Sequence, residues 1–379
     1  MTFQKVSSVF QVAEMYDVVV VGGGVIGAAC ARELARSGRR VAILDRDGER
    51  GQAWHASAGM LAPQIEGRQG DLLFDLGLAG RELYCELAGQ LKDETGVDIG
   101  LWRGGSAAVA LEESEAADLR SKVAWQRQQG HLCDWLDASE VRERYPWLGP
   151  CLGALWAPHE GALDPVRLVQ ALRTDAISHQ AALVNDEAVA LDRRGDRVVG
   201  VIGRRSHYAA AQVLLAAGAW VRLLGGLPRP LPVEPVRGQM LALPWPDGVE
   251  RAMVYHRNCY LLARGDEAIA GSTMEYVGYD PSVTSSGLAR ILSAAGALVP
   301  ALAQVPVSRS WAGLRPVSPD GLPILGAEPR LAGLWYAAGF GRHGVLLAAV
   351  AAMLLRIMMN GQTPTEDLSA LRPQRFYDW

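Results

Sequence analysis

Residues 16–45 carry the pattern that most narrows what this chain can fold into. An apolar run, Tyr16 to Val21, leads into GGGVIG at 22–27, then into a helical stretch to about Ser37 and a second apolar run that ends at Asp45. Continuously apolar, β-branched runs are typical of strands buried on both faces, and the helix between them completes a βαβ unit. The sequence therefore predicts an α/β fold that begins with a parallel strand pair.

The glycines of the segment 22–27 spell GxGxxG, and each has a mechanical role. Gly22 permits a tight turn, Gly24 lets the backbone approach a pyrophosphate, and Gly27 lets the helix pack closely on the strand. The amides and dipole at the start of the helix attract phosphates. Asp45 lies where its carboxylate can accept a hydrogen bond from a ribose hydroxyl. Strand, helix and acid in this order indicate a dinucleotide site.

Two features favour FAD over NAD as the dinucleotide, and a third segment is compatible with a flavin. NAD dehydrogenases usually complete the nucleotide domain in contiguous sequence, whereas here the regular pattern breaks up after Asp45. The segment 54–62 (WHASAGMLA) is rich in small residues and would let backbone approach a ring system. A second glycine turn, 339–344 (GFGRHG), stands between an expected strand and an expected helix. Two interpretations of this segment stay open. Its backbone amides stabilise the negative charge that builds on a flavin during reduction, or the segment is an ordinary tight turn.

The rest of the chain is less regular but still divides into elements. Pro165 after Asp164 indicates a helix start, with aspartate as the cap. Three strands are expected between 187 and 216. Other helices are expected at about 70–95, 112–130 and 345–359, and other strands at 236–243, 253–263, 267–273 and 334–338.

Composition excludes several classes of protein. With 379 residues and 49% apolar content, the chain can bury a large core and is long enough for two domains. The net charge of −4 provides no basic field for nucleic acid. Five scattered cysteines without a CxxC pair argue against a disulfide framework and against a metal site, and they suit the cytoplasm.

The chain shows no pattern for a membrane or for secretion. Its longest apolar run, 344–355, is about half of the ~20 residues that a span needs, so we expect a buried helix and no membrane partner. Residues 1–14 lack the apolar stretch of a signal peptide, and we expect them to be a disordered extension.

Five segments, taken in order, resemble a known family: GGGVIGAACARELARSG at 22–38, SAGML at 57–61, YHRNCYLLAR at 255–264, WAGLRPVSPDGLPILG at 311–326 and AAGFGRHGVLLA at 337–348. They are spread over nearly the whole chain beyond residue 15. Together they resemble the glycine oxidases of the D-amino-acid oxidase superfamily, which serve thiamine biosynthesis.

The resemblance implies a discontinuous Rossmann-type FAD-binding domain and an inserted α+β substrate domain built on an antiparallel sheet. We expect the FAD domain to comprise 15–82, 155–232 and 312–379, and the substrate domain 83–154 and 233–311. The implied reaction is oxidative deamination of glycine, sarcosine or a small D-amino acid, with hydride transfer to flavin N5. Water then hydrolyses the imine to an oxo acid, and molecular oxygen reoxidises the flavin to give hydrogen peroxide. A homotetramer is implied as well.

Arg315 is the first candidate for binding the substrate. It stands in the apolar, proline-bounded segment WAGLRP, where a guanidinium without an anionic partner would be costly to bury. Its planar fork matches a carboxylate in bidentate geometry. By resemblance it is the main carboxylate clamp, Arg342 contacts substrate and flavin, Tyr260 hydrogen-bonds the carboxylate and Met274 lines the pocket. From the residues alone, other roles stay open for these side chains. They are a structural ion pair for Arg315, a phosphate or surface contact for Arg342, and core packing for Tyr260 and Met274.

The cofactor residues predicted from the first glycine motif and from the resemblance come from five parts of the chain. They are Gly22, Gly24, Val25, Ile26, Gly27, Asp45, Arg46, Ala53, Trp54, Ala58, Gly59, Met60, Val189, Phe340, Gly341, Arg342, His343, Gly344, Val345 and Leu346. Near Ala53 and Trp54 the family prefers hydroxyl residues. Asn258 also departs from the family, since some glycine oxidases carry the second histidine of a His-x-His pair there. We assign no catalytic base, because hydride transfer from a neutral amine does not require one.

Three other functions remain open. A dehydrogenase of the same superfamily would pass electrons to a membrane quinone. A non-catalytic flavin-binding protein would keep GxGxxG but would have no need of Arg315 and Tyr260. The oxidase module of a tRNA-modifying enzyme is disfavoured by the acidic charge balance and by the lack of a partner domain.

Overall fold

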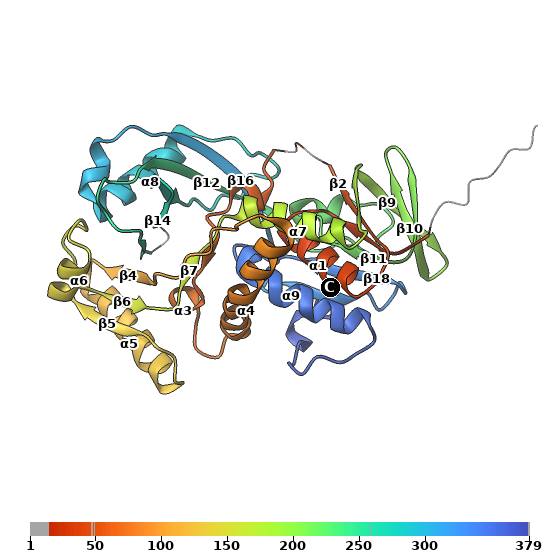
Figure 1. Ribbon diagram of the computed structural model, residues 1–379, viewed down its shortest axis with the longest axis horizontal. Coiled ribbons are helices and arrows are strands. Elements are labelled where there is room, and N and C mark those ends of the chain that lie inside the picture. The colour runs from red at the N-terminus through yellow and green to blue at the C-terminus, as the bar shows by residue number, and fades with distance from the viewer. Residues whose placement is uncertain (1–14, 47, 49, 258, 378–379) are drawn as a thin grey trace, which may run out of the picture.

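The fold is taken from a computed structural model that describes residues 15–377 except 47, 49 and 258 (Figure 1). The expectations for residues 1–14 and for Asn258 therefore lie outside the described residues. Two sheets organise the molecule, and Figure 1 shows them at opposite ends of its long axis, with α3 and β7 between them.

The first sheet confirms the predicted α/β nucleotide fold. Its β1 is paired in parallel with β2 on one side and β11 on the other. Along the sheet the strands are β17 (Ile324–Ala327), β18 (Leu334–Ala338), β11 (His207–Leu215), β1 (Tyr16–Val21), β2 (Val41–Asp45) and β8 (Ala182–Asn185). A hairpin of β9 (Ala188–Arg194) and β10 (Arg197–Gly203) continues from β11 in antiparallel fashion.

Helices cover one face of this sheet. Val18 and Val20 of β1 point into a core shared with the helices, whereas Val19 and Val21 point into a second core on the opposite face. Because both faces are buried, the strand has no polar side and reads as a continuous apolar run. The covering helices are α1 (Val25–Arg36), α4 (Leu72–Thr95), α7 (Pro165–Ser178) and α9 (Gly344–Met359).

The second sheet is mainly antiparallel, as expected for the substrate domain. Only the β13–β4 pair is parallel among its described ladders. Its strands, in order, are β16 (Arg309–Val317), β12 (Glu234–Pro244), β15 (Glu267–Gly271), β14 (Cys259–Arg264), β13 (Met253–His256), β4 (Ser106–Ala110), β6 (Gly153–Ala157) and β5 (Asp134–Asp137). The helices packed on it are α5 (Glu113–Gln128), α6 (Ala138–Arg144) and α8 (Ser285–Leu298).

Short elements connect the two sheets. They are α2 (Ala53–Ala56), β3 (Met60–Leu61), α3 (Pro63–Glu66) and β7 (Gly161–Ala162), and β3 pairs with β7. The expected domain bounds stay a prediction. The bound between residues 154 and 155 falls inside β6, which is paired with β4 in the second sheet.

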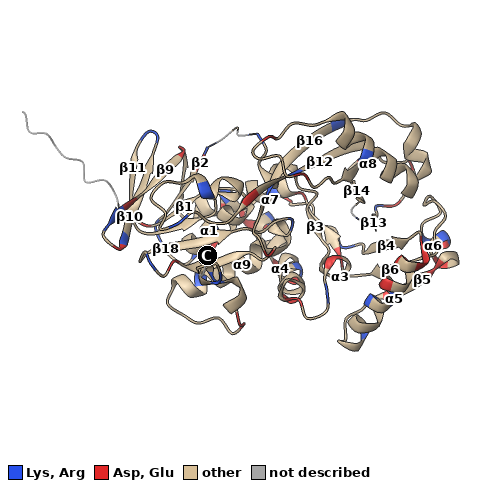
Figure 2. Ribbon diagram, turned by 180° about the vertical axis from the view of Figure 1, so that it is seen from behind, with Lys and Arg blue, Asp and Glu red and all other residues tan. Residues whose placement is uncertain are grey.

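Charged residues are scattered over both parts of the ribbon rather than gathered on one (Figure 2). Among the described residues, no helix is long and apolar enough to cross a membrane. The apolar helix α9 instead packs against α1 and α4.

The third glycine of the first motif yields a test of the fold. A Cβ atom on Gly27 would overlap the carbonyl oxygen of Gly22, which would force α1 away from β1. We expect Gly27→Ala to lower the free energy of unfolding by about 1–3 kcal/mol. Gly89→Ala is the matched control, because Gly89 is an exposed helical glycine with open space around it. It should raise stability by up to about 1 kcal/mol. Equal urea midpoints for the two variants would contradict the packing argument.

Candidate active site

A cavity of about 560 Å³ lies between the two sheets. This volume is within the range of cofactor and ligand sites in proteins. Its walls come from the glycine turn before α1, the α2–β3 connection, the start of β9, the strands β12, β14 and β16, and the glycine turn before α9.

Two helix N-termini open onto this cavity. The turn before α1 contributes Gly22 and Gly24, and the turn before α9 contributes His343 and Gly344. Neither helix has a side-chain hydrogen bond at its N-cap. The first amides of a helix lack intrahelical partners and carry a partial positive charge, so both ends can receive an anionic or electron-rich group.

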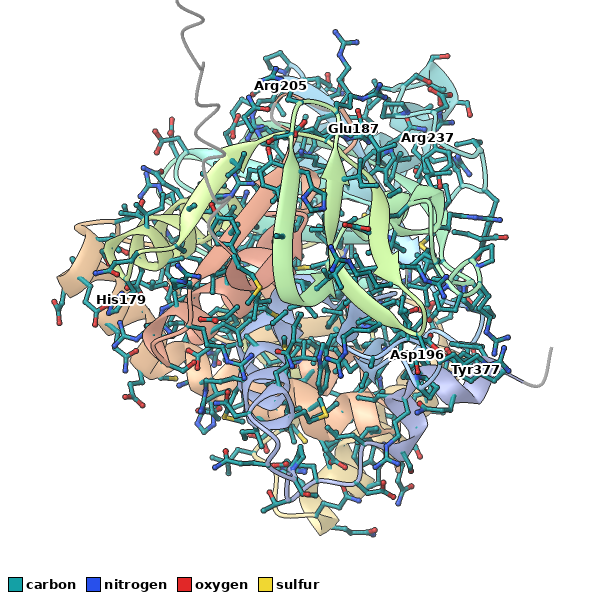
Figure 3. All side chains as sticks on the ribbon, turned by 90° about the vertical axis from the view of Figure 1, so that its right-hand side faces the viewer. His179, Glu187, Asp196, Arg205, Arg237 and Tyr377 are labelled. Carbon is teal, nitrogen blue, oxygen red and sulfur yellow. The ribbon has the colours of Figure 1, made fainter. Side chains whose placement is uncertain are left out.

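Ion pairs line the end of the cavity nearest β9. Asp45, the last residue of β2, is ion-paired with Arg173 of α7. Arg46 lies 3.1 Å from Glu187, which also pairs with Arg204. Figure 3 shows Glu187 near Arg205 at one end of the β9–β10 hairpin, with Asp196 at the other end. Asp45 thus has a cationic partner in addition to the ribose contact predicted for it.

At the other end of the cavity, Arg315 lies without a carboxylate partner among the described residues. Its Nη1 donates to the carbonyl oxygen of Thr273 at 3.0 Å, and its Nη2 donates to the Ser272 hydroxyl at 2.7 Å. Both acceptors are neutral, and burial lowers the pKa of Arg315. Arg237 on the neighbouring strand differs, since it is buried against Glu275 and Asp280, each at 2.8 Å. Arg315 therefore has its charge available for a ligand.

Two tyrosines line this cavity, and the charge of Arg315 acts on one of them, Tyr260. The ring centroids of Tyr255 and Tyr260 are 6.0 Å apart, and both side chains are buried. Burial raises the pKa of Tyr260 to about 12, so its hydroxyl stays protonated and can donate. Gly238 on β12 makes the room, because a Cβ atom there would overlap the Arg315 guanidinium. Met274 is half exposed at the cavity wall.

A second cationic group, Arg342, already has a carboxylate partner. Its Nε lies 3.2 Å from Glu66 Oε2, and His343 Nε2 lies 3.3 Å from the same oxygen. The Tyr255 hydroxyl donates to the other oxygen at 3.5 Å. Burial alone would raise the pKa of Glu66, but the contacts with His343 and Arg342 outweigh it and hold that pKa below its usual value. Glu66 is therefore an anion at neutral pH.

The structure brings the predicted residues together. Every residue predicted from the motifs and the resemblance lines this cavity, apart from Gly27, which packs against Gly22 instead. Glu66, Tyr255 and Ser272 line it too and were not predicted. The sequence did not identify Glu66 as a site residue, because a single glutamate after a small-residue segment is compatible with many roles. His256 does not line the cavity and lies 3.2 Å from Glu115.

The arrangement fits the FAD dependent oxidoreductase family, whose pattern matches residues 17–356. The chain belongs to this family. Its cofactor is FAD, for which the cavity supplies two uncapped helix N-termini and a glycine cradle. As a family member it is an FAD-dependent enzyme that acts on amines or amino acids.

Known family members resemble the chain over nearly its full length. The glycine oxidase of Geobacillus kaustophilus is 35% identical over 93% of this chain and 95% of its own. A crystal structure of glycine oxidase from that organism superposes with a TM-score of 0.89, covering 95% of this chain and 99% of that one at 34% identity. The crystal structure of iminodiacetate oxidase from Chelativorans sp. BNC1 is also similar, with a TM-score of 0.87 and 28% identity over 94% of this chain and 98% of that one.

A buried carboxyl group, Glu160, fixes the segment that carries Glu66. It accepts hydrogen bonds from the backbone N–H groups of Gln64 and Ile65 and from the Ser106 hydroxyl. Burial raises the pKa of Glu160 to about 7, although these hydrogen bonds act in the opposite direction. The short helix α3 is thereby tied to β4 of the second sheet.

The raised pKa predicts a pH effect on stability. Between about pH 4.5 and pH 7 the folded protein keeps a proton on Glu160 that the unfolded chain has released, so this group costs stability as pH rises through that window. Glu160→Gln imitates the protonated form. We expect it to flatten the dependence of unfolding free energy on pH between 5 and 7 and to gain about 1–3 kcal/mol at pH 8. Urea titrations at a series of pH values check this, and an unchanged slope would contradict it.

Proposed function

We propose that this protein oxidises glycine, sarcosine or a small D-amino acid to an imine, which water hydrolyses to the oxo acid and ammonia. One observation carries the proposal: Arg315 faces the cavity with neutral acceptors only, beside a protonated Tyr260 hydroxyl. A guanidinium taken out of water is costly unless an anion joins it, and the α-carboxylate of an amino acid is a matching anion.

The residues around Arg315 would orient the substrate. The guanidinium fork would hold the carboxylate, and the hydroxyl of Tyr260 would donate a further hydrogen bond to it. Met60 and Tyr255 line the same wall, with the tyrosine hydroxyl 3.0 Å from the methionine sulfur, and they would limit the size of the side chain admitted. Bound FAD supplies the acceptor for two electrons, and the chain itself would contribute positioning rather than proton transfer.

The acceptor, the assembly and the setting belong to the proposal as well. We expect molecular oxygen to reoxidise the enzyme with release of hydrogen peroxide, and we expect a homotetramer in the cytoplasm that serves thiamine biosynthesis. The likeness to glycine oxidases supports these expectations. A dehydrogenase that passes electrons to a quinone is the alternative for the acceptor.

An anaerobic titration tests the reaction. The purified holoprotein should show an oxidised flavin spectrum, and glycine, sarcosine or D-alanine should bleach it in the absence of air. Readmitted oxygen should restore the yellow colour with one equivalent of peroxide. Slow return of colour without peroxide, together with rapid reduction of a quinone analogue, would favour the dehydrogenase. Retention of the oxidised spectrum with all three amines would refute the proposed function.

Removal of the guanidinium tests its role. We expect Arg315→Ala to raise the KM for the preferred amine by at least about thirtyfold, because loss of a buried, hydrogen-bonded charge pair costs about 2–5 kcal/mol. FAD content should not change. Arg309→Ala is the matched control, since this arginine lies on the same strand, is exposed and pairs with Glu267. An unchanged KM in Arg315→Ala would exclude this residue as the carboxylate clamp.

A further inference from the structure

Glu66 is an acidic group whose charge reaches the proposed substrate clamp, and its contacts are well defined. It lines the cavity, its side chain is only 15% exposed, and its oxygens contact Arg342, His343 and Tyr255. Its charge acts on Arg315 and on Tyr260, so it belongs to the same electrostatic site.

The backbone holds Glu66 in place. It ends α3, and the two residues before it donate their backbone N–H groups to Glu160. The side-chain amide of Gln64 donates to Gln126 at 3.0 Å, and Lys122 donates to the carbonyl oxygen of Ile65 at 2.5 Å. The backbone at Glu66 is thereby fixed, so its carboxylate can leave this position only by changing rotamer and giving up its contacts with Arg342, His343 and Tyr255.

The charges in this part of the cavity leave one cation unmatched. Arg315 has no carboxylate partner among the described residues, while Arg342 is paired with Glu66. A substrate with one carboxylate can pair with Arg315 and leave the Glu66–Arg342 pair intact. A second carboxylate that reached Arg342 would have to share this cation with Glu66 and would lie next to the negative charge of Glu66. Like charges placed next to each other in a binding site cost up to several kcal/mol.

We propose that Glu66 restricts the enzyme to substrates with a single carboxylate, because its negative charge neutralises the cation that a second carboxylate would need and repels that carboxylate. This inference rests on the proposed function and adds a determinant of substrate class. Specificity of this kind combines an attractive contact for the right ligand with a repulsive one for the wrong ligand. The probe is iminodiacetate, which is sarcosine with a carboxylate in place of one methyl hydrogen, and which gives its name to a similar solved oxidase.

Binding of two unreactive ligands isolates the effect from turnover. Methoxyacetate and diglycolate are the ether counterparts of sarcosine and iminodiacetate, so neither can be oxidised as an amine. Each is titrated into the FAD-loaded protein, and the change in the flavin spectrum yields a Kd. We expect the wild type to bind methoxyacetate at least tenfold more tightly than diglycolate. In Glu66→Gln the affinity for diglycolate relative to methoxyacetate should rise by at least tenfold, which corresponds to about 1.4 kcal/mol.

Three further variants separate charge from structure. Glu66→Asp keeps the charge and should keep the wild-type preference. Glu66→Gln combined with Arg342→Met should lose the gain for diglycolate, because the second carboxylate would have no cation. Glu33→Gln is the matched control: Glu33 also pairs with two arginines, Arg32 and Arg356, and none of the three lines the cavity. It should retain the wild-type ratio.

The outcomes distinguish this inference from the proposed function. Turnover of iminodiacetate relative to sarcosine should rise in Glu66→Gln in parallel with binding. An unchanged Kd ratio in Glu66→Gln, or a wild type that binds diglycolate as well as methoxyacetate, overturns the role of Glu66 even if sarcosine is oxidised. If the wild type oxidises no amine but shows the predicted shift in Kd, the role of Glu66 stands and the reaction proposed above is wrong.

Discussion

The central constraint in this structure is a guanidinium held in a cavity without an internal counter-charge. The buried arginines Arg32 and Arg237 are neutralised by carboxylates of the chain itself. Arg315 is held by the carbonyl of Thr273 and the hydroxyl of Ser272, and Gly238 leaves space for it across the β12–β16 ladder. The strands thus fix the position of the charge and leave its neutralisation to a ligand. An anionic substrate relieves this cost as it binds.

The fold joins this charge to the cofactor through segments that lie far apart in the sequence. The α1 end of the cavity comes from the first 46 residues, the α9 end from residues 339–346, and the clamp from β12, β14 and β16 of the second sheet. Because α1 packs directly against α9, the two helix N-termini face a common space. The first sheet is discontinuous in sequence, because its strands come from residues 16–45, 182–215 and 324–338, with strands of the second sheet between them.

The βαβ unit and the last strand and helix were predictable because local rules dominate there. Tyr16–Val21 and Leu334–Ala338 form strands with the predicted bounds, and Asp164 caps α7 as its sequence indicates. The run 253–263 was predicted as one strand but forms the hairpin β13–β14, with a turn at Arg257, whose φ is 51°. Its apolar residues continue through both strands, so periodicity did not reveal the turn. Glu66 was missed because its partners Arg342 and His343 lie far along the chain, and only the packed sheets bring them together.

A crystal structure of the FAD-loaded protein with acetate tests the central claim most directly. Acetate has one carboxylate and little else, so its position shows which cation the cavity leaves unmatched. The account predicts both carboxylate oxygens at about 2.7–3.0 Å from donors of Arg315 and Tyr260, with Glu66 still paired to Arg342. Acetate on Arg342, with Arg315 bound only to Ser272 and Thr273, would contradict it.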